Sequence, residues 1–274
     1  MKKLFSLLLA GLMIASLAAC SDKEEVNNDL EDYRREEIKV DHYTNEKGET
    51  FYFDSLDSET ITITKYEGQD LPHAVEIPAE MEGKKVAGIS DMAFYSLSNI
   101  SEVIIPDSIT VIGDMAFAEC RQLTKINIPA SVESIGDSVF WRCASLETVT
   151  FAQGSKITEI PKYAFKECAS LKSITVFASI EKIGDGAFHA CTALESVVIE
   201  EGVKTLGAQA FQDCDALASV TLPASLVEIG AYNFLGSEAL YLEGITAPAD
   251  SVAAKYIATL NLTNKPAEEE TPAA

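Results

Sequence analysis

The chain has 274 residues, of which 43 are acidic and 21 basic, and its formal net charge at pH 7 is −22. A chain this acidic is repelled by nucleic-acid phosphates and by anionic membrane surfaces, both of which are bound by clusters of Lys and Arg. We therefore expect no nucleic-acid partner.

The first 19 residues predict a signal peptide. Lys2 and Lys3 give a basic start, residues 4–17 are apolar, and small residues precede Cys20. The apolar run is as short as a signal-peptide core and charged residues follow it, so a membrane-spanning helix is the weaker interpretation. Removal of residues 1–19 takes away two lysines and no acid, which makes the chain still more acidic.

The stretch Leu17-Ala18-Ala19-Cys20 resembles a bacterial lipobox, in which the cysteine is acylated and becomes the first residue of the mature chain. Each buried methylene adds about 0.8 kcal/mol of membrane affinity, so several acyl chains on Cys20 would anchor the protein firmly. The alternative is an ordinary secretory signal. The acidic residues that follow resemble a lipoprotein surface-export signal of some Gram-negative anaerobes. They imply an outer-membrane location facing the cell exterior, with a periplasmic location as the alternative.

Two segments precede the main part of the chain. Residues 20–42 are rich in charged and polar side chains and predict an acidic flexible tether. Residues 43–85 are β-rich, and the runs 51–53 and 60–64, separated by polar residues, predict a hairpin.

From about residue 86 to residue 245 the chain repeats itself, mostly with a period of 23 residues. Each copy has a phenylalanine with Ile or Leu five residues before it, and five copies have a cysteine three residues after it. The phenylalanines are Phe94, Phe117, Phe140, Phe165, Phe188, Phe211 and Phe234, and the cysteines are Cys120, Cys143, Cys168, Cys191 and Cys214. A period of 20–29 residues with this spacing indicates a leucine-rich-repeat solenoid of about seven repeats.

A single copy predicts how each repeat is built. Residues 124–128 alternate between outward polar and inward apolar side chains, which indicates a strand. Asp114, like Asp91, Asp137 and Asp185, stands where a short helix would need an N-cap. We therefore expect an α/β fold: a right-handed superhelix with a parallel sheet on one face and short helical turns on the other.

The motif in residues 112–129, Ile-Gly-Asp-x-Ala-Phe-x-x-Cys-x-x-Leu followed by Ile-x-Ile-Pro, is similar to that of the BspA-like family of bacterial leucine-rich repeats. The resemblance covers roughly two thirds of the chain. It departs from the pattern at Ile160-Pro161-Lys162, which replaces Ile-Gly-Asp, and in one repeat that is two residues longer. The resemblance implies a surface-displayed binding solenoid, since members are associated with adhesion to host matrix proteins or to other cells.

A solenoid must cover its terminal repeats. We expect residues 43–85 to form a β-rich N-terminal cap and residues 246–264 a C-terminal cap helix, because the apolar residues of 252–260 have helical spacing. Residues 265–274, rich in Pro, Glu and Ala, predict a disordered tail.

The repeat cysteines lack the close pairs of a zinc site, and stacked parallel side chains suit disulfide geometry poorly. We therefore expect a ladder of buried free thiols and no metal. No nucleophile motif, phosphate loop or calcium loop is present, and the repeat geometry brings no His close to a carboxylate or serine. We expect neither a cofactor nor enzymatic activity.

The outward positions of the predicted sheet are rich in hydroxyl groups and poor in charge. They are Lys125, Asn127, Thr148, Thr150, Ser173, Thr175, Ser196, Val198, Ser219 and Thr221. One explanation is that such residues simply suit strands. The other is that they form a platform for a ligand. On the opposite side, Tyr95 and Trp141 are candidate exposed aromatic residues.

Together these patterns predict a monomeric, lipid-anchored surface protein that binds a protein or a glycan through its repeat sheet. A structural or accessory subunit docked to another envelope protein is the alternative, and an enzyme a more distant one.

Overall fold

The computed structural model describes residues 41–68, 73–237, 239–240 and 244–263, all of which belong to one compact unit, residues 40–274. The predicted signal peptide, Cys20, nearly all of the tether and the predicted tail lie outside the described residues. Within the described part of the chain, no helix is both long and apolar enough to cross a membrane.

The described chain begins with an antiparallel meander. It consists of β1 (Asp41–Thr44), β2 (Thr50–Ser55) and β3 (Thr60–Glu67), so the predicted hairpin is confirmed. The short β5 (Glu80–Met81) pairs antiparallel with β6 (Lys84–Ile89). Strand β3 also pairs in parallel with β6, and this pairing joins the meander to the first repeat.

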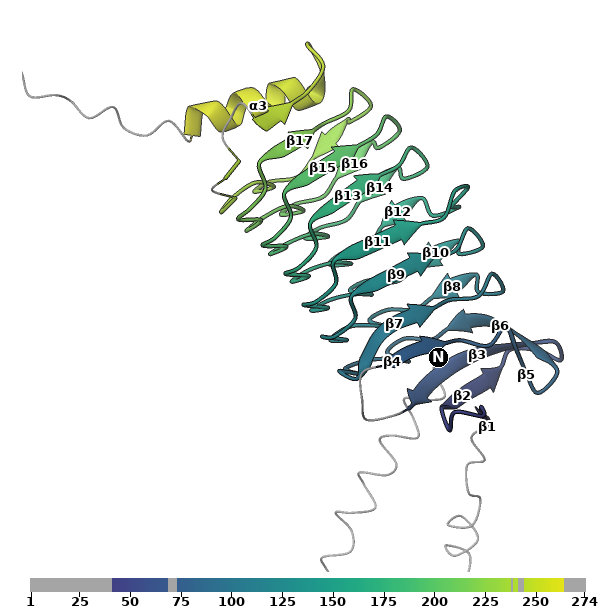
Figure 1. Ribbon diagram of the computed structural model, residues 1–274. Coiled ribbons are helices and arrows are strands. Elements are labelled where there is room, and N and C mark those ends of the chain that lie inside the picture. Colours follow the sequence, from purple (N-terminus) through teal and green to yellow (C-terminus); the bar gives the residue numbers. More distant parts are fainter. Residues whose placement is uncertain (1–40, 69–72, 238, 241–243, 264–274) are drawn as a thin grey trace, which may run out of the picture. The chain divides into compact units, whose positions relative to one another are not determined.

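One side of the repeats, which we call the long-strand face, is built from parallel strands of consecutive turns (Figure 1). They are β4 (His73–Glu76), β7 (Ile100–Ile104), β9 (Lys125–Ile128), β11 (Thr148–Phe151), β13 (Ser173–Val176), β15 (Ser196–Ile199), β17 (Ser219–Thr221) and β19 (Ile245–Thr246). In these strands inward apolar side chains alternate with outward polar ones, as the sequence predicts.

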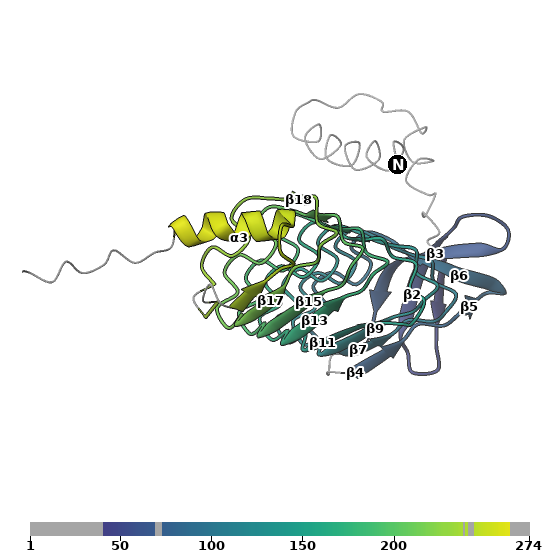
Figure 2. The same ribbon diagram turned by 90° about the horizontal axis from the view of Figure 1, so that it is seen from above.

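A second parallel ladder, the short-strand face, continues from β6. Its strands are β8 (Val111–Ile112), β10 (Ser134–Ile135), β12 (Glu159–Ile160), β14 (Lys182–Ile183), β16 (Thr205–Leu206) and β18 (Glu228–Ile229). Seen from above, the long strands lie along one side and β18 lies on the other (Figure 2). The sequence does not predict this second ladder, because two-residue strands are too short to leave an alternating pattern.

The prediction of short helical turns on the third side, the turn face, is wrong. There the chain makes tight turns with single residues in the left-handed region, such as Met115 (φ 54°) and Glu119 (φ 59°). Alternate N–H groups donate to the next repeat, as from Phe117 to the Val139 carbonyl at 3.0 Å, and those between them bond within the turn, as from Ala118 to the Met115 carbonyl. The fold is therefore a β-solenoid with parallel sheets and few helices rather than α/β.

The repeated aspartates have a different role from the predicted helix N-cap. Oδ1 of Asp114 accepts a hydrogen bond at 2.8 Å from the backbone N–H of Asp137, one repeat later. Asp137 bonds the N–H of Lys162 at 3.0 Å in the same way. Because the backbone N–H is the donor, the contact persists where the next residue is not an aspartate.

The core is a continuous stack of rings. The seven repeat phenylalanines are stacked, with interplanar angles of at most 24° and neighbouring centroids between 5.1 Å (Phe94–Phe117) and 6.1 Å (Phe211–Phe234). Tyr66 of β3 stacks on the first ring, and Tyr256 packs against the last at 6.4 Å. Tyr256 belongs to α3 (Val252–Thr263), which begins where Oγ of Ser251 accepts the N–H of Ala254.

The five cysteines form a buried ladder beside the rings. All are free thiols, and each donates to the carbonyl of the phenylalanine in the preceding repeat at 3.0–3.2 Å. Desolvation on burial raises the pKa of the Cys120 and Cys214 thiols to about 12, so they stay protonated at neutral pH. The predicted ladder of small buried side chains is confirmed.

Candidate binding surface

The ten outward residues predicted as a ligand platform do lie together on the long-strand face. Strand register places Thr150 beside Asn127, Ser173 beside Ser196, and Val198 beside Thr221. All ten are exposed apart from Ser196, which is half-buried. The sequence therefore predicted the position of this surface correctly, while its use as a binding site remains a prediction.

This surface carries little charge. Lys125 is the one ionisable residue among the ten, and its Nζ pairs with Glu102 of β7 at 2.9 Å. Elsewhere hydroxyl and amide groups interact, as where Oγ1 of Thr150 donates to Oδ1 of Asn127 at 2.8 Å. An uncharged, hydrogen-bonding face on so acidic a protein suits a ligand with polar groups and no strong negative charge.

Both ladders are interrupted at the same repeat. Strand β11 is the last of one long-strand sheet and β13 the first of the next, while β10 and β12 end their sheets on the short-strand face. We call this interruption the ladder break. The repeats remain in contact across it through the Phe140 and Phe165 rings, 5.4 Å apart, and through the bond from the Phe140 N–H to the Ala164 carbonyl.

The residue that replaces glycine in the repeat motif explains the break. At Gly136 an added Cβ would lie 2.4 Å from the backbone N of Asp114, so only glycine permits this close approach between repeats. Pro161 occupies the equivalent position in the next repeat and has a ring there instead. It also lacks the N–H with which Gly184 bonds the Ile160 carbonyl one repeat earlier. Pro161 therefore cannot donate the bond that continues the short-strand ladder, although Lys162 beside it still bonds Asp137 of the preceding repeat.

The two extra residues of the longer repeat lie on the other side of the same break, in the loop 152–156. This loop, β11 and β13 enclose a groove of about 700 Å³. Thr148, Thr150, Ser173 and Thr175 line it with hydroxyl groups, and the otherwise inward Ile174 lies at its floor. The sequence signalled this groove only indirectly, through Pro161 and the longer repeat.

Two aromatic rings line one part of the groove. Phe151 and Phe177 are half-buried and pack at a tilt, with ring centroids 5.3 Å apart. Other repeats have an aliphatic residue in place of Phe151, such as Ile128, and often a proline in place of Phe177, such as Pro129. These rings are thus additions specific to the two repeats that flank the break, and they do not belong to the central stack.

A family model described as a BspA type leucine rich repeat region matches six copies, over residues 87–218 and 158–258. The chain belongs to this family. No curated protein matches the BspA-type chain significantly.

Solved structures share the fold of this BspA-type chain. A leucine-rich-repeat protein of T. pallidum is 29% identical over 77% of this chain and 92% of its own, with a TM-score of 0.65. One from Eubacterium ventriosum is 23% identical over 76% and 52%, with a TM-score of 0.63. Another, from Bacteroides ovatus, is 23% identical over 72% and 52%, with a TM-score of 0.51. The last two show likeness of fold alone.

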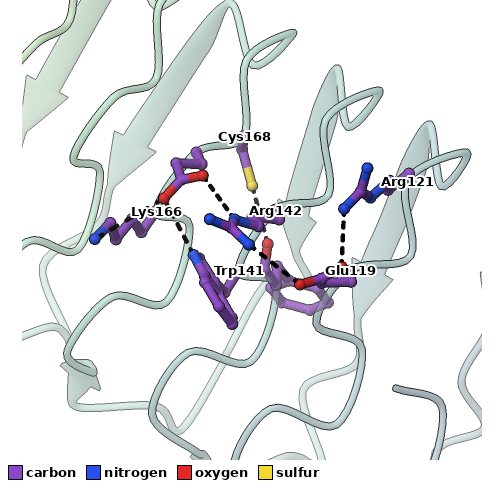
Figure 3. A network of polar contacts seen from close by, with 8 residues as sticks. Glu119, Arg121, Trp141, Arg142, Lys166 and Cys168 are labelled. Atoms are coloured by element: carbon purple, nitrogen blue, oxygen red, sulfur yellow. Dashed lines mark hydrogen bonds and ion pairs between the residues drawn. The ribbon is translucent and has the colours of Figure 1, made fainter. Parts of the chain in front are cut away.

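On the turn face of this BspA-type repeat region, Trp141 lies under Arg142, whose guanidinium carbon is 4.4 Å from the ring centroid (Figure 3). Arg142 also bonds Glu167 at 2.8 Å and Glu119 at 3.4 Å, so it links three repeats. Partial burial acts to raise the pKa of Glu167, but hydrogen bonds from Arg142 and Trp141 lower it overall. Trp141, like Tyr95, is half-buried rather than fully exposed, so this network is better suited to joining repeats than to binding a ligand.

A polar cluster lies inside the N-terminal part, where the sequence indicated none. Nε2 of His73 is 2.9 Å from the Tyr66 hydroxyl and 3.3 Å from Oε1 of the fully buried Glu49. Burial, followed by the nearby Glu49 charge, raises the pKa of Tyr66. This enclosed cluster connects the turn between β1 and β2 with β3 and β4, and its burial gives it a structural role. A second His–carboxylate pair, His189 and Asp213, lies 3.6 Å apart on the turn face, so the expectation that the repeats bring no His close to a carboxylate is wrong.

The described residues contain no group of three or more His, Cys, Asp or Glu side chains placed to hold a metal ion. The five repeat thiols are buried and protonated, which leaves them poor nucleophiles. Of the described surfaces, the long-strand face and its groove therefore remain the candidate binding site.

Proposed function

We propose that this BspA-type protein is a cell-surface binding module that engages a protein or a glycan through its long-strand face. The observation that carries the proposal is the exposed, nearly uncharged row of ten side chains on a protein with a net charge of −22. Solenoids commonly use such extended surfaces to hold partners. We propose further that the protein is a monomer and that it has no enzymatic activity.

Lipid anchoring at Cys20 and an outer-membrane location facing the exterior belong to the same proposal and are supported by the lipobox-like sequence. Mass spectrometry of the N-terminus tests the first, since an unmodified Cys20 would contradict it. Digestion of intact cells by an added protease tests the second, because a periplasmic protein would stay intact.

The binding role is tested with the full chain on an array of matrix proteins and glycans. A variant with Thr148, Thr150, Ser173 and Thr175 changed to Glu places four charges on the long-strand face. A control variant with Ser134, Thr158 and Thr205 changed to Glu charges the short-strand face instead. We expect hits that only the first variant loses. If both variants keep the same array hits as the parent, the binding site lies on another surface.

An array with no hit would contradict the binding role as stated. A partner that co-purifies from membranes in stoichiometric amount would then establish the alternative, an accessory subunit of an envelope complex. Each result therefore selects between the two functions.

A further inference from the structure

We propose that the groove at the ladder break binds a neutral oligosaccharide. The proposal rests on the function proposed above and assigns it a specific site and ligand class. The site comprises the facing edges of β11 and β13, the loop 152–155, and the rings of Phe151 and Phe177.

Several departures from the repeat pattern coincide at this one place. Pro161 replaces the glycine that lets repeats approach closely, and the extra residues of the loop 152–156 widen the same repeat. Phe151 and Phe177 bring aromatic rings to the long-strand face at the same break. Together they form a hollow lined with ligand-binding groups.

The lining has an apolar part and a hydrogen-bonding part, and a sugar presents the same two kinds of surface. The apolar face of a sugar ring can pack on the partly exposed Phe151 and Phe177 rings. Its hydroxyl groups can donate to and accept from the hydroxyls of Thr150 and Thr175 and the amide of Gln153. Strands β11 and β13 are also sheet edges, which present backbone N–H and C=O groups that sugar hydroxyls can bond.

The charge of the groove determines which class of saccharide it can bind. Glu147 and Glu200 line the groove, and no residue in its lining is basic. Oε2 of Glu200 accepts the N–H of Ala178 at 2.9 Å, which fixes this carboxylate where it can also accept a sugar hydroxyl. The overall charge of −22 adds to the repulsion of anions. Sulfated and sialylated glycans are therefore disfavoured, and a neutral one fits.

The dimensions disfavour an inserted peptide strand. A strand added between β11 and β13 would need about 4.8 Å on each side. The Phe151 and Phe177 rings, with centroids 5.3 Å apart, pack against each other and obstruct that end of the groove. The groove volume of about 700 Å³ is instead that of an ordinary small-ligand site, a class that spans roughly 300–1,000 Å³.

The test measures binding of the full chain to cellotriose, maltotriose and chitotriose by saturation-transfer NMR and calorimetry. Because the full chain is proposed to carry a lipid anchor, it is kept in a detergent, and this detergent must have no sugar head group. A heparin tetrasaccharide, sialyllactose and a trilysine peptide serve as charged comparison probes. We expect at least one neutral trisaccharide to bind and the two anionic glycans not to bind.

Two variants restore the repeat pattern at the groove. The first, Phe151→Ile with Phe177→Pro, introduces the residues found at these positions in the repeat that contains Ile128 and Pro129. The second deletes residues 153–154 and changes Pro161→Gly, which should close the ladder break. Because both follow the sequence of neighbouring repeats, we expect them to fold. Tyr232→Leu, which removes an aromatic ring that is 65% exposed away from the groove, is the matched control.

We expect at least a tenfold loss of trisaccharide affinity in both groove variants and no change in the control. The proposal is overturned if no neutral trisaccharide binds with a dissociation constant of about 10 mM or lower. It is also overturned if only a charged probe binds, or if the folded groove variants bind as well as the parent. If saccharides fail while the array gives protein hits that depend on the long-strand face, this inference is wrong and the binding function stands. If both fail, the function itself is wrong.

Discussion

The thiol of Cys143 donates a hydrogen bond at 3.1 Å to the backbone carbonyl of Phe117 in the preceding repeat. Ser237, which replaces cysteine in the last repeat, makes the same contact, with its Oγ 3.0 Å from the Phe211 carbonyl. The motif position therefore requires a small side chain that can donate to a buried carbonyl. Cysteine meets this requirement at a lower desolvation cost than serine.

Removal of the donor at this position should destabilise the fold. In Cys143→Ala the Phe117 carbonyl loses its side-chain donor but keeps the Cys120 N–H, so we expect a loss of about 0.5–1.5 kcal/mol in unfolding free energy. Cys143→Ser keeps the donor and should lose less. Urea unfolding of the two variants checks this ranking, which equal losses would contradict.

The thiol ladder should make the protein sensitive to alkali. Burial raises the pKa of Cys120 from 9.0 to about 12, whereas in the unfolded chain the thiol ionises near its ordinary value. The unfolded state therefore loses its proton first, so this stabilisation is complete below about pH 9 and is lost as the pH rises toward 12. Unfolding midpoints measured from pH 7 to pH 10.5 should fall less steeply in Cys120→Ser than in the parent. If the midpoints of the parent and the variant fall equally with pH, the Cys120 thiol does not contribute to the loss of stability in alkali.

Glycine at the close approach between repeats should be irreplaceable. In Gly136→Ala the new Cβ would lie 2.4 Å from backbone atoms of the preceding repeat, so these repeats must separate. We expect a loss of more than about 3 kcal/mol. Gly154→Ala is the control, since its Cβ meets nothing within 4 Å and only its positive φ of 80° opposes the change. It should cost about 1 kcal/mol. Thermal unfolding distinguishes the two.

Truncation of one ring in the stack should be costly because it leaves a cavity between two others. Phe140 is fully buried between Phe117 and Phe165. We expect Phe140→Ala to lower the unfolding free energy by about 3–5 kcal/mol. Phe140→Leu fills more of the space and should lose less, and chemical denaturation measures both. A loss below about 1 kcal/mol for alanine would mean that the stack contributes little.

The single tryptophan reports on the turn-face network. Arg142→Ala uncovers the Trp141 ring, so its fluorescence emission should shift to longer wavelength and acrylamide should quench it more strongly. Arg121→Ala is the control, because Arg121 contacts Glu119 without covering the ring. An unchanged spectrum in Arg142→Ala would show that the ring is not covered in solution.

Periodicity made most of the fold predictable. Phenylalanines 23 residues apart must coincide when repeats stack, and the alternation after each of them fixes which side chains of the long strands face outward. The buried thiols, the ring stack and the position of the long-strand face all follow from this. The predicted helical turns were wrong because a tight turn such as residues 114–120 has the same short apolar spacing as a helix. The left-handed backbone of Met115 and Glu119 and the hydrogen bonds from alternate N–H groups to the next repeat distinguish the turn from a helix.

The groove was the part that sequence alone did not predict. Pro161 and the longer repeat are visible in the sequence, but they identify a groove only when the steric need for glycine at this position is known. The cluster around Glu49 lies outside the repeats, so no periodic signal marked it. Tyr66, which joins that cluster to the ring stack, shows how the meander meets the first repeat.

The ladder break also affects how the molecule comes apart. In a solenoid each repeat contacts only its neighbours, so cooperativity passes along a one-dimensional array and is limited by its weakest interface. Between β11 and β13 that interface lacks strand pairing and depends largely on stacked rings and turn-face bonds. The repeats before and after it are therefore the natural units of partial unfolding. Amide hydrogens beside the break should exchange with solvent faster than those in the middle of either block.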